Sequence, residues 1–212
     1  MSQIVLNRVG KRYGKSWILR DVSVVFSPGQ VYGLIGENGI GKTVLLRLLC
    51  GLSSATEGQV EVDGKVLGRE LEFLPNCGII IETPGFLGSR TGFDNLLYLD
   101  SLSHKPDVEK IRKSMVRCGL DPDSRKRVGA YSLGMRQRLG IAQAIMDDPD
   151  ILILDEPTNG LDKQGVRDAV RIIQETKQKG KLVILASHHM EEIEEVCDTV
   201  YRIQTQTLCP CY

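Results

Sequence analysis

The sequence predicts an α/β fold with a mainly parallel sheet, antiparallel β elements near the N-terminus and an inserted helical lobe. A short apolar run at 30–35 leads into a glycine-rich stretch and then into a helical pattern at 42–50. Apolar runs of strand length return at 151–154 and 181–186, with an amphipathic helical pattern at 163–179 between them. Strand, helix and strand joined by short links indicate parallel strands with crossover helices.

The first third of the chain is predicted to be rich in strands. Residues 3–8 and 22–26 contain clusters of β-branched residues, which favour strands. Residues 59–62 are predicted as a further strand that ends in the hairpin-type turn Asp63-Gly64.

The glycine-rich stretch has the pattern Gly-x4-Gly-Lys-Thr, which is that of the P-loop. Its glycines let backbone N–H groups point into one concavity, and the following helix directs its positive end there. Lys42 adds a positive charge for the terminal phosphates, and the Thr43 hydroxyl is a ligand for Mg²⁺. We therefore predict a P-loop NTPase core whose nucleotide site includes Gly36, Glu37, Asn38, Gly39, Gly41, Lys42 and Thr43.

After Pro84, apolar residues recur with helical spacing at 92–103, 107–119 and 133–147. This part interrupts the strands that precede and follow it. The predicted domains are a nucleotide-binding core, residues 1–84 and 149–212, and an inserted α-helical subdomain, residues 85–148.

The bulk properties narrow the class of protein. Lys+Arg and Asp+Glu are both 27, whereas a nucleic-acid-binding protein normally has a basic excess, so no direct nucleic-acid contact is expected. The longest apolar runs have the length of strands, so no membrane span is expected. The N-terminus lacks the pattern of a signal peptide, so we expect a cytosolic protein.

Two acids follow the predicted strand at 151–154. In P-loop ATPases an acid at the end of a neighbouring strand reaches the Mg²⁺ that the P-loop hydroxyl holds, and Asp155 fits that role. Glu156 follows at once and is predicted to orient and deprotonate the attacking water. Ordinary solvated acids at a strand end are the alternative.

Two further segments are placed for phosphate contacts. His188 and His189 follow the strand at 181–186, where an imidazole can reach the γ-phosphate, and spacing does not choose between them. Ser132 and Gly134 precede a strong helix, which predicts either a second anion site or a simple Ser N-cap.

Together these segments resemble the ATP-binding cassette (ABC) family along nearly the whole chain. The resemblance rests on Leu34-Ile-Gly-Glu-Asn-Gly-Ile-Gly-Lys-Thr43 as Walker A, Tyr131-Ser-Leu-Gly-Met-Arg-Gln-Arg-Leu139 as the signature sequence, Ile151-Leu-Ile-Leu-Asp-Glu-Pro157 as Walker B and Asn159-Gly-Leu-Asp162 as the D-loop. Ser187-His188 resembles the switch histidine, so the resemblance selects His188. Arg12-Tyr13-Gly-Lys15 is similar to the aromatic A-loop, in which Tyr13 would stack on adenine.

The family implies a head-to-tail dimer with ATP at the interface, each molecule held by Walker A of one chain and the signature of the other. It implies catalytic roles for Glu156, His188 and Lys42. Beyond the P-loop it implies nucleotide contacts from Tyr13, Val44, Ser132, Gly134 and Asp162, and Mg²⁺ ligation by Thr43, Glu82 and Asp155.

This chain departs from the usual family pattern at four positions. Val44 stands where a hydroxyl residue is usual, which removes one α-phosphate hydrogen bond. Leu133 and Met135 replace a glycine and the glutamine of Leu-Ser-Gly-Gly-Gln. Glu82 replaces the Q-loop glutamine, and this loop resembles that of ATPase subunits from bacitracin and lantibiotic self-protection exporters.

The resemblance therefore implies an ATP-hydrolysing subunit of an exporter, with a peptide antibiotic or similar amphiphile as cargo. A separate membrane-spanning permease is the expected partner, together with a homodimer or heterodimer of ATPase subunits on the inner face of the membrane. The alternatives are an ABC ATPase that acts on ribosomes or DNA, and a non-hydrolysing regulatory cassette. The first usually carries two cassettes or a long coiled coil, and the intact Lys42, Asp155, Glu156 and His188 argue against the second.

Overall fold

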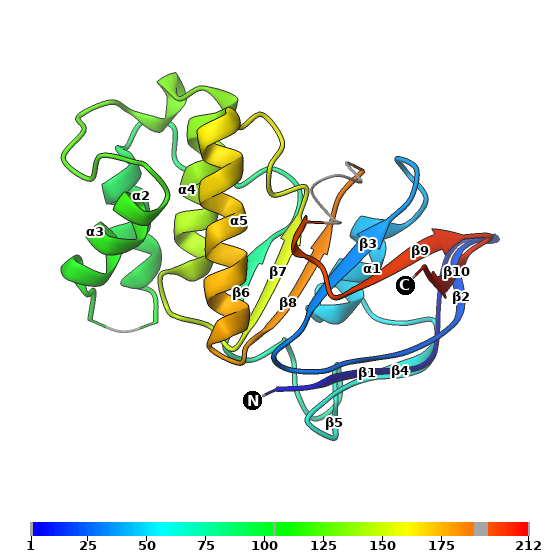
Figure 1. The fold of residues 1–212 in the computed structure, drawn as a ribbon. Helices are drawn as coiled ribbons and strands as arrows, with labels where there is room; N and C mark the ends of the chain where they lie inside the picture. The colour runs from blue at the N-terminus through cyan, green and yellow to red at the C-terminus, as the bar shows by residue number, and fades with distance from the viewer. Residues whose placement is uncertain (1, 104, 189–194, 212) are drawn as a thin grey trace.

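Two sheets form the framework of the computed structural model, which describes residues 2–103, 105–188 and 195–211 (Figure 1). The larger sheet has the strand order β10-β9-β3-β8-β7-β6, and β6, β7, β8, β3 and β9 run parallel to one another. Its strands are β3 (Val31–Ile35), β6 (Cys77–Ile80), β7 (Ile151–Asp155), β8 (Leu182–Ala186), β9 (Thr199–Gln204) and the antiparallel edge strand β10 (Thr207–Pro210). The expected α/β class with a mainly parallel sheet is confirmed.

Each buried strand of the larger sheet supplies two separate cores, because successive side chains point to opposite faces. In β7, Leu152 and Leu154 belong to the core under α4 and α5. Ile151 and Ile153 belong to the second core, under α1 and the smaller sheet. The strand therefore reads as a continuous apolar run, as expected for a sheet that is covered on both faces.

The smaller sheet is antiparallel, with the order β2-β1-β4-β5. It comprises β1 (Ile4–Tyr13), β2 (Ser16–Phe26), β4 (Glu57–Val62) and β5 (Lys65–Val66). Asp63 and Gly64 have φ of 51° and 78° and join β4 to β5, which confirms the predicted hairpin.

The predicted bounds of the first two strands were wrong, because both strands are much longer than 3–8 and 22–26. Their pairing shifts register between Leu6 and Val9, between Val9 and Lys11, and between Lys11 and Arg12. Each shift changes which side chains face the core, so the alternation that identifies a strand breaks at 9–21.

The helices cover the two faces of the larger sheet (Figure 1). α1 (Lys42–Leu49) lies on the side of the antiparallel sheet, and α5 (Lys163–Gln178) lies on the other with α4 (Leu133–Ile145). α2 (Gly92–Asp100), α3 (Val108–Arg117) and a short 3₁₀ helix (Val128–Ala130) lie between β6 and β7 in the chain, before α4.

Local sequence signals set the ends of these helices. Thr91 and Asp94 form a capping box at the start of α2, and Asp107, Ser132 and Asp162 cap α3, α4 and α5. Gly180 has φ of 76° just after α5, which fits the predicted C-terminal stop.

The inserted helices share one apolar cluster with the sheet: Leu96, Ile111 and Leu139 belong to the same core as Leu154. We propose that residues 85–148 form a lobe that packs on a core of residues 1–84 and 149–212. In the part of the chain that the structure describes, no helix is both long and apolar enough to cross a membrane.

Candidate nucleotide site

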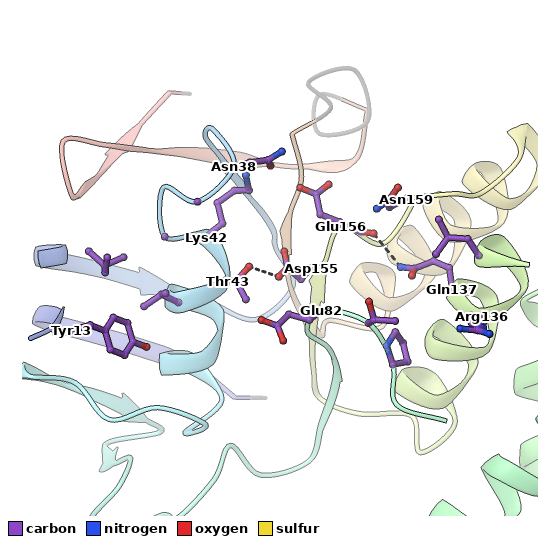
Figure 2. Close-up of a pocket in the computed structure, with 17 residues that line it drawn as sticks. Tyr13, Asn38, Lys42, Thr43, Glu82, Arg136, Gln137, Asp155, Glu156 and Asn159 are labelled. Atoms are coloured by element: carbon purple, nitrogen blue, oxygen red, sulfur yellow. Dashed lines mark hydrogen bonds between the residues drawn. The ribbon is translucent and has the colours of Figure 1, made fainter. Parts of the chain in front are cut away.

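Several of the predicted site residues lie at the carboxyl ends of the parallel strands (Figure 2). The P-loop follows β3, Glu82 follows β6, Asp155 ends β7, and His188 follows β8. Parallel strands bring these ends to one edge of the sheet, which is where ligands bind in open α/β sheets. A pocket of about 360 Å³ lies there, with a lining that includes Tyr13, Asn38, Gly39, Gly41, Lys42, Thr43, Val44, Glu82, Asp155 and Glu156.

The backbone of the P-loop depends on glycine. Gly36, Gly39 and Gly41 have φ of 154°, 80° and 120°. A Cβ at Gly41 would lie 2.9 Å from Ile18, a pocket-lining residue. Gly41 is the N-cap of α1, which has no side-chain cap and no acid in its first turn, so the helix end favours an anion.

Lys42 is held over the loop by the loop's own carbonyl groups. Its Nζ donates to the Gly36 oxygen at 2.6 Å and to the Glu37 oxygen at 3.3 Å. The side chain is buried but lines the pocket. Phosphate oxygens can replace these neutral acceptors with stronger charged ones.

Thr43 and Asp155, which two separate motifs predict as ligands of one Mg²⁺, are in direct contact. The Thr43 hydroxyl donates to Asp155 Oδ2 at 2.7 Å. Burial raises the pKa of Asp155, and repulsion from Glu156 and Glu82 raises it further, while the Thr43 bond and Lys42 act in the opposite direction. Negative charge is therefore concentrated at this point.

Glu82 lies in the pocket (Figure 2). It pairs with Arg47, one turn after Thr43 on α1. Arg47 Nη2 donates to Glu82 Oε1 at 2.8 Å. The Glu82 backbone has φ of 60°, a left-handed conformation that is uncommon for a glutamate.

Glu156 and His188 are held together at the next strand end. His188 Nδ1 lies 2.8 Å from Glu156 Oε2, and the Glu156 N–H donates to the Ala186 oxygen at 2.8 Å. Glu156 has φ of 48°, so the chain turns sharply after β7. His189 lies outside the described residues.

Sequence reasoning missed Gln137, which fastens the backbone of the acid pair. Its Nε2 donates to the Glu156 oxygen at 3.1 Å and to the Pro157 oxygen at 3.0 Å. The signal for it was present: Gln137 shares the buried face of α4 with Ile141 and Ile145 at helical spacing. A polar residue on such a face needs buried partners.

The remaining predicted residues lie outside this pocket. Ser132 is exposed and accepts from the Met135 N–H at 3.2 Å, so the expected N-cap is present. Gly134 and Asp162 also fall outside the lining, and Gly36 and Glu37 line a smaller neighbouring pocket. Leu133, between Ser132 and Gly134, does line the pocket, so the N-terminus of α4 lies at its edge.

The donor set fits a hard divalent cation. Thr43, Asp155 and Glu82 offer oxygen atoms to one pocket, and burial, together with repulsion from Glu156 and Glu82, raises the pKa of Asp155 there. No group of three or more His, Cys, Asp or Glu residues with a metal-binding arrangement occurs in the ranges that the structure describes. Mg²⁺ typically uses one or two carboxylates together with substrate phosphates, so the donors present suit it.

Comparisons with known proteins agree with this geometry. The profile of the ABC transporter family matches residues 19–159. The chain is 42% identical over 194 residues to the uncharacterized ABC transporter ATP-binding protein YybJ of Bacillus subtilis (strain 168), covering 92% of this chain and 88% of YybJ. It is 37% identical to the bacitracin transport ATP-binding protein BcrA of Enterococcus faecalis, covering 90% of this chain and 62% of BcrA. It is 35% identical to the lantibiotic transport ATP-binding protein SrtF of Streptococcus pyogenes, covering 92% of this chain and 84% of SrtF.

Solved structures share the fold. An ATP-binding subunit of an ABC transporter superposes with a TM-score of 0.85 at 24% identity, covering 97% of this chain and 87% of that chain. The ATP-binding cassette MJ0796, in a dimeric post-hydrolysis state with ADP and Pi, superposes with a TM-score of 0.85 at 18% identity, covering 97% of this chain and 96% of that chain. The chain therefore belongs to the ATP-binding cassette transporter family and is an ATP-binding, ATP-hydrolysing subunit.

Proposed function

We propose that this chain hydrolyses MgATP in a dimer of ATPase subunits and so drives export of a peptide antibiotic or similar amphiphile. A separate membrane-spanning permease carries the cargo, and this chain works on the cytoplasmic face of the membrane. The observation that carries the proposal is the contact of Glu156 with His188 beside the Thr43–Asp155 pair.

The proposed roles follow from this arrangement. Glu156 accepts a proton from the attacking water, and His188 holds that carboxylate and reaches the γ-phosphate. Lys42 and the P-loop N–H groups bind the phosphates, and Tyr13 stacks on the adenine. Mg²⁺, held by Thr43, Asp155 and Glu82, would neutralise charge on the phosphate oxygens.

The dimer supplies what one chain lacks on its own. Ser132 and Gly134 are at the N-terminus of α4 but outside the pocket of their own chain. An exposed hydroxyl at the positive end of a helix favours a phosphate from a second chain. The dimeric state of the MJ0796 cassette supports this arrangement.

The cargo is proposed from the relatives. BcrA is named for bacitracin transport and SrtF for lantibiotic transport. Glu82 adds to this proposal, because the sequence of its loop resembles that group.

Hydrolysis is tested with Glu156→Gln, which keeps the shape of the side chain and removes the base. Turnover should fall by about 10²–10⁴-fold while MgATP binding persists. The matched control is Asp150→Asn, at the opposite end of β7, where Asp150 accepts from Asn76. Turnover of Glu156→Gln at the level of the control would refute the assigned role.

The split site predicts that specific activity rises with protein concentration and that ATP promotes dimers in light scattering. Ser132→Arg should abolish both, because it places bulk where the partner's phosphate binds. Flat specific activity without dimers would refute the split site.

Export is tested in the host. A Glu156→Gln allele should sensitise cells to a panel of bacitracin and lantibiotics and leave sensitivity to unrelated small antibiotics unchanged. Unchanged sensitivity to the whole peptide panel would refute the proposed cargo but not the ATPase.

A further inference from the structure

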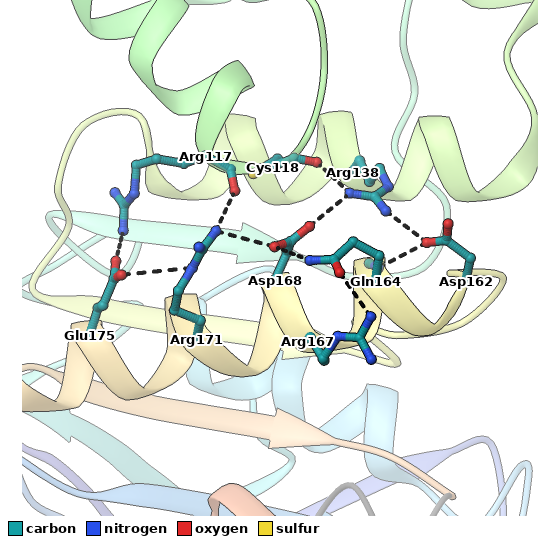
Figure 3. Close-up of polar contacts among 10 residues, drawn as sticks. Arg117, Cys118, Arg138, Asp162, Gln164, Arg167, Asp168, Arg171 and Glu175 are labelled. Atoms are coloured by element: carbon teal, nitrogen blue, oxygen red, sulfur yellow. Dashed lines mark hydrogen bonds and ion pairs between the residues drawn. The ribbon is translucent and has the colours of Figure 1, made fainter.

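Arg138, in the middle of α4, joins four separate parts of the chain (Figure 3). Its Nη1 donates to the Cys118 oxygen at 2.8 Å, just after α3, and to Asp168 Oδ2 at 3.2 Å on α5. Its Nη2 donates to Asp162 Oδ1 at 2.7 Å, just before α5. The guanidinium fork therefore uses both of its terminal nitrogens.

The structure leaves space specifically for this side chain. A Cβ at Gly165 would lie 2.8 Å from Arg138 Nη2, and one at Gly119 would lie 2.5 Å from Nη1. The Arg138 side chain is 14% exposed and that of Asp168 is 13% exposed. The Asp162 side chain is 73% exposed, so the bond to Asp168 is the largely buried one, and it holds the guanidinium in a fixed geometry from which Nη2 reaches Asp162.

Asp162 is the end of the loop that follows Glu156, and Arg138 fixes that end. The same Oδ1 also accepts from the Gly165 N–H at 2.8 Å, as the N-cap of α5. Gly160 lies earlier in the same loop. A Cβ at Gly134 would lie 2.6 Å from the Gly160 oxygen, so the first turn of α4 packs directly on the loop backbone. The loop is thus attached to α4 at two points.

A neighbouring pair makes the role of Arg138 distinct. Arg117, at the end of α3, pairs with Glu175 on α5 at 2.7 Å. This pair also joins the helical lobe to α5, but Glu175 lies far along the helix from Asp162 (Figure 3). Only one of the two arginines therefore contacts the loop.

We propose that Arg138 is a positioning residue that fixes the loop ending at Asp162 to α4, so that Ser132 and Asp162 of one chain keep the spacing needed to complete the ATP site of a second chain. The inference rests on the proposed dimer. Arg138 of one chain would then affect the ATP site of the second chain and not the ATP pocket of its own chain.

The proposal predicts that Arg138 affects the dissociation constant of the dimer but not the affinity of one chain for MgATP. The described lining of the pocket at Lys42 does not include Arg138, so the affinity of a single chain for MgATP should not depend on it. Association of two ATP-loaded chains should depend on it, because both partner-facing groups are then free to move apart.

The experiment uses Arg138→Gln in the full chain that also carries Glu156→Gln, so that ATP is not consumed. MgATP affinity is measured at protein concentrations below dimer formation, and the dimer dissociation constant is measured by sedimentation with saturating MgATP. We expect MgATP affinity within about twofold of the parent and a dimer dissociation constant raised about tenfold, which corresponds to about 1.4 kcal/mol. Arg138→Lys should raise it less, since one ammonium replaces the fork.

Two further variants keep the test decisive. Arg117→Gln removes the parallel link between α3 and α5 and should leave both constants unchanged. Asp168→Asn weakens the ion pair with Arg138 without changing the loop, and it should also raise the dimer dissociation constant. It replaces Arg138→Gln in the test if Arg138→Gln does not fold.

Equal dimer constants for Arg138→Gln, Asp168→Asn and the parent would overturn the inference. A parallel loss of MgATP affinity, or the same effect from Arg117→Gln, would also overturn it, since either shows a general loss of structure. A parent chain that forms no dimer at any MgATP concentration would refute the proposed dimer itself.

Discussion

The ion pair between Arg47 and Glu82 leads to a prediction with opposite signs for its two members. Glu82 is a proposed Mg²⁺ ligand, yet its carboxylate is bound to Arg47 at 2.8 Å. A carboxylate that ligates the cation must give up at least part of this pair. Arg47 therefore competes with Mg²⁺ for Glu82, and removal of Arg47 should strengthen the apparent Mg²⁺ affinity.

The size of the effect follows from exposure. The side chains of Arg47 and Glu82 are 39% and 59% exposed. Pairs of this kind contribute about 0.2–1 kcal/mol, so Arg47→Gln should raise the apparent Mg²⁺ affinity about 1.4- to 5-fold. Glu82→Gln should lower it, because an amide oxygen is a weaker ligand than a carboxylate. Glu82→Gln should also tighten ATP binding in EDTA, since it removes a negative charge near the γ-phosphate.

The assay is titration of nucleotide with and without Mg²⁺ on both single variants and the double variant. The double variant should behave as Glu82→Gln does, because without the Glu82 carboxylate Arg47 no longer competes with Mg²⁺. Lys113→Gln is the control for surface charge, since it removes an exposed pair with Glu109 on α3. A shift of the same sign in Arg47→Gln and Glu82→Gln would refute the competition.

Three further predictions concern stability, each read from thermal unfolding of the protein without nucleotide. Gly78→Ala should destabilise by about 1–3 kcal/mol or more, because its Cβ would overlap the Ala144 carbonyl of α4; an unchanged midpoint would contradict this packing. Asp155→Asn should raise the midpoint at neutral pH, because the raised pKa of Asp155 means that its charged form opposes folding, while the amide oxygen can still accept from the Thr43 hydroxyl; a lowered midpoint would contradict that sign. Hydrogen bonds from two lysines lower the pKa of Asp148, so its stabilising contribution is present above the usual value of 3.8 and is lost as the pH falls below it; Asp148→Asn should flatten that part of the acid limb, and an identical limb would refute the assignment.

Sequence patterns predicted the parts of the fold whose signals are local. The buried strand before Asp155 is a continuous apolar run, and Ser132, expected as an anion site or an N-cap, stands directly before helical spacing. Two motifs 112 residues apart predict Thr43 and Asp155 as ligands of one cation; their side chains are hydrogen-bonded, and the shared cation remains a prediction.

The features that the sequence did not reveal depend on contacts between distant segments. The bulges of β1 and β2 arise where pairing shifts, and no short window contains both strands. Arg138 reads as an ordinary helix residue until α3 and α5 bring Cys118 and Asp168 beside it. His188 was selected by the family resemblance, because the spacing in Ser187-His188-His189 does not distinguish the two histidines.

Two adjacent residues of α4, Gln137 and Arg138, contact the two ends of the loop that follows β7. Gln137 donates to the carbonyl groups of Glu156 and Pro157, and so supports a glutamate whose φ of 48° is unfavourable. Strain of this kind costs about 1–3 kcal/mol and persists only where surrounding contacts hold it. Arg138, the next residue, donates to Asp162 at the other end of the same loop. Because both residues sit on one rigid helix, a movement of α4 displaces the proposed base of its own site and the groups offered to the partner's site together.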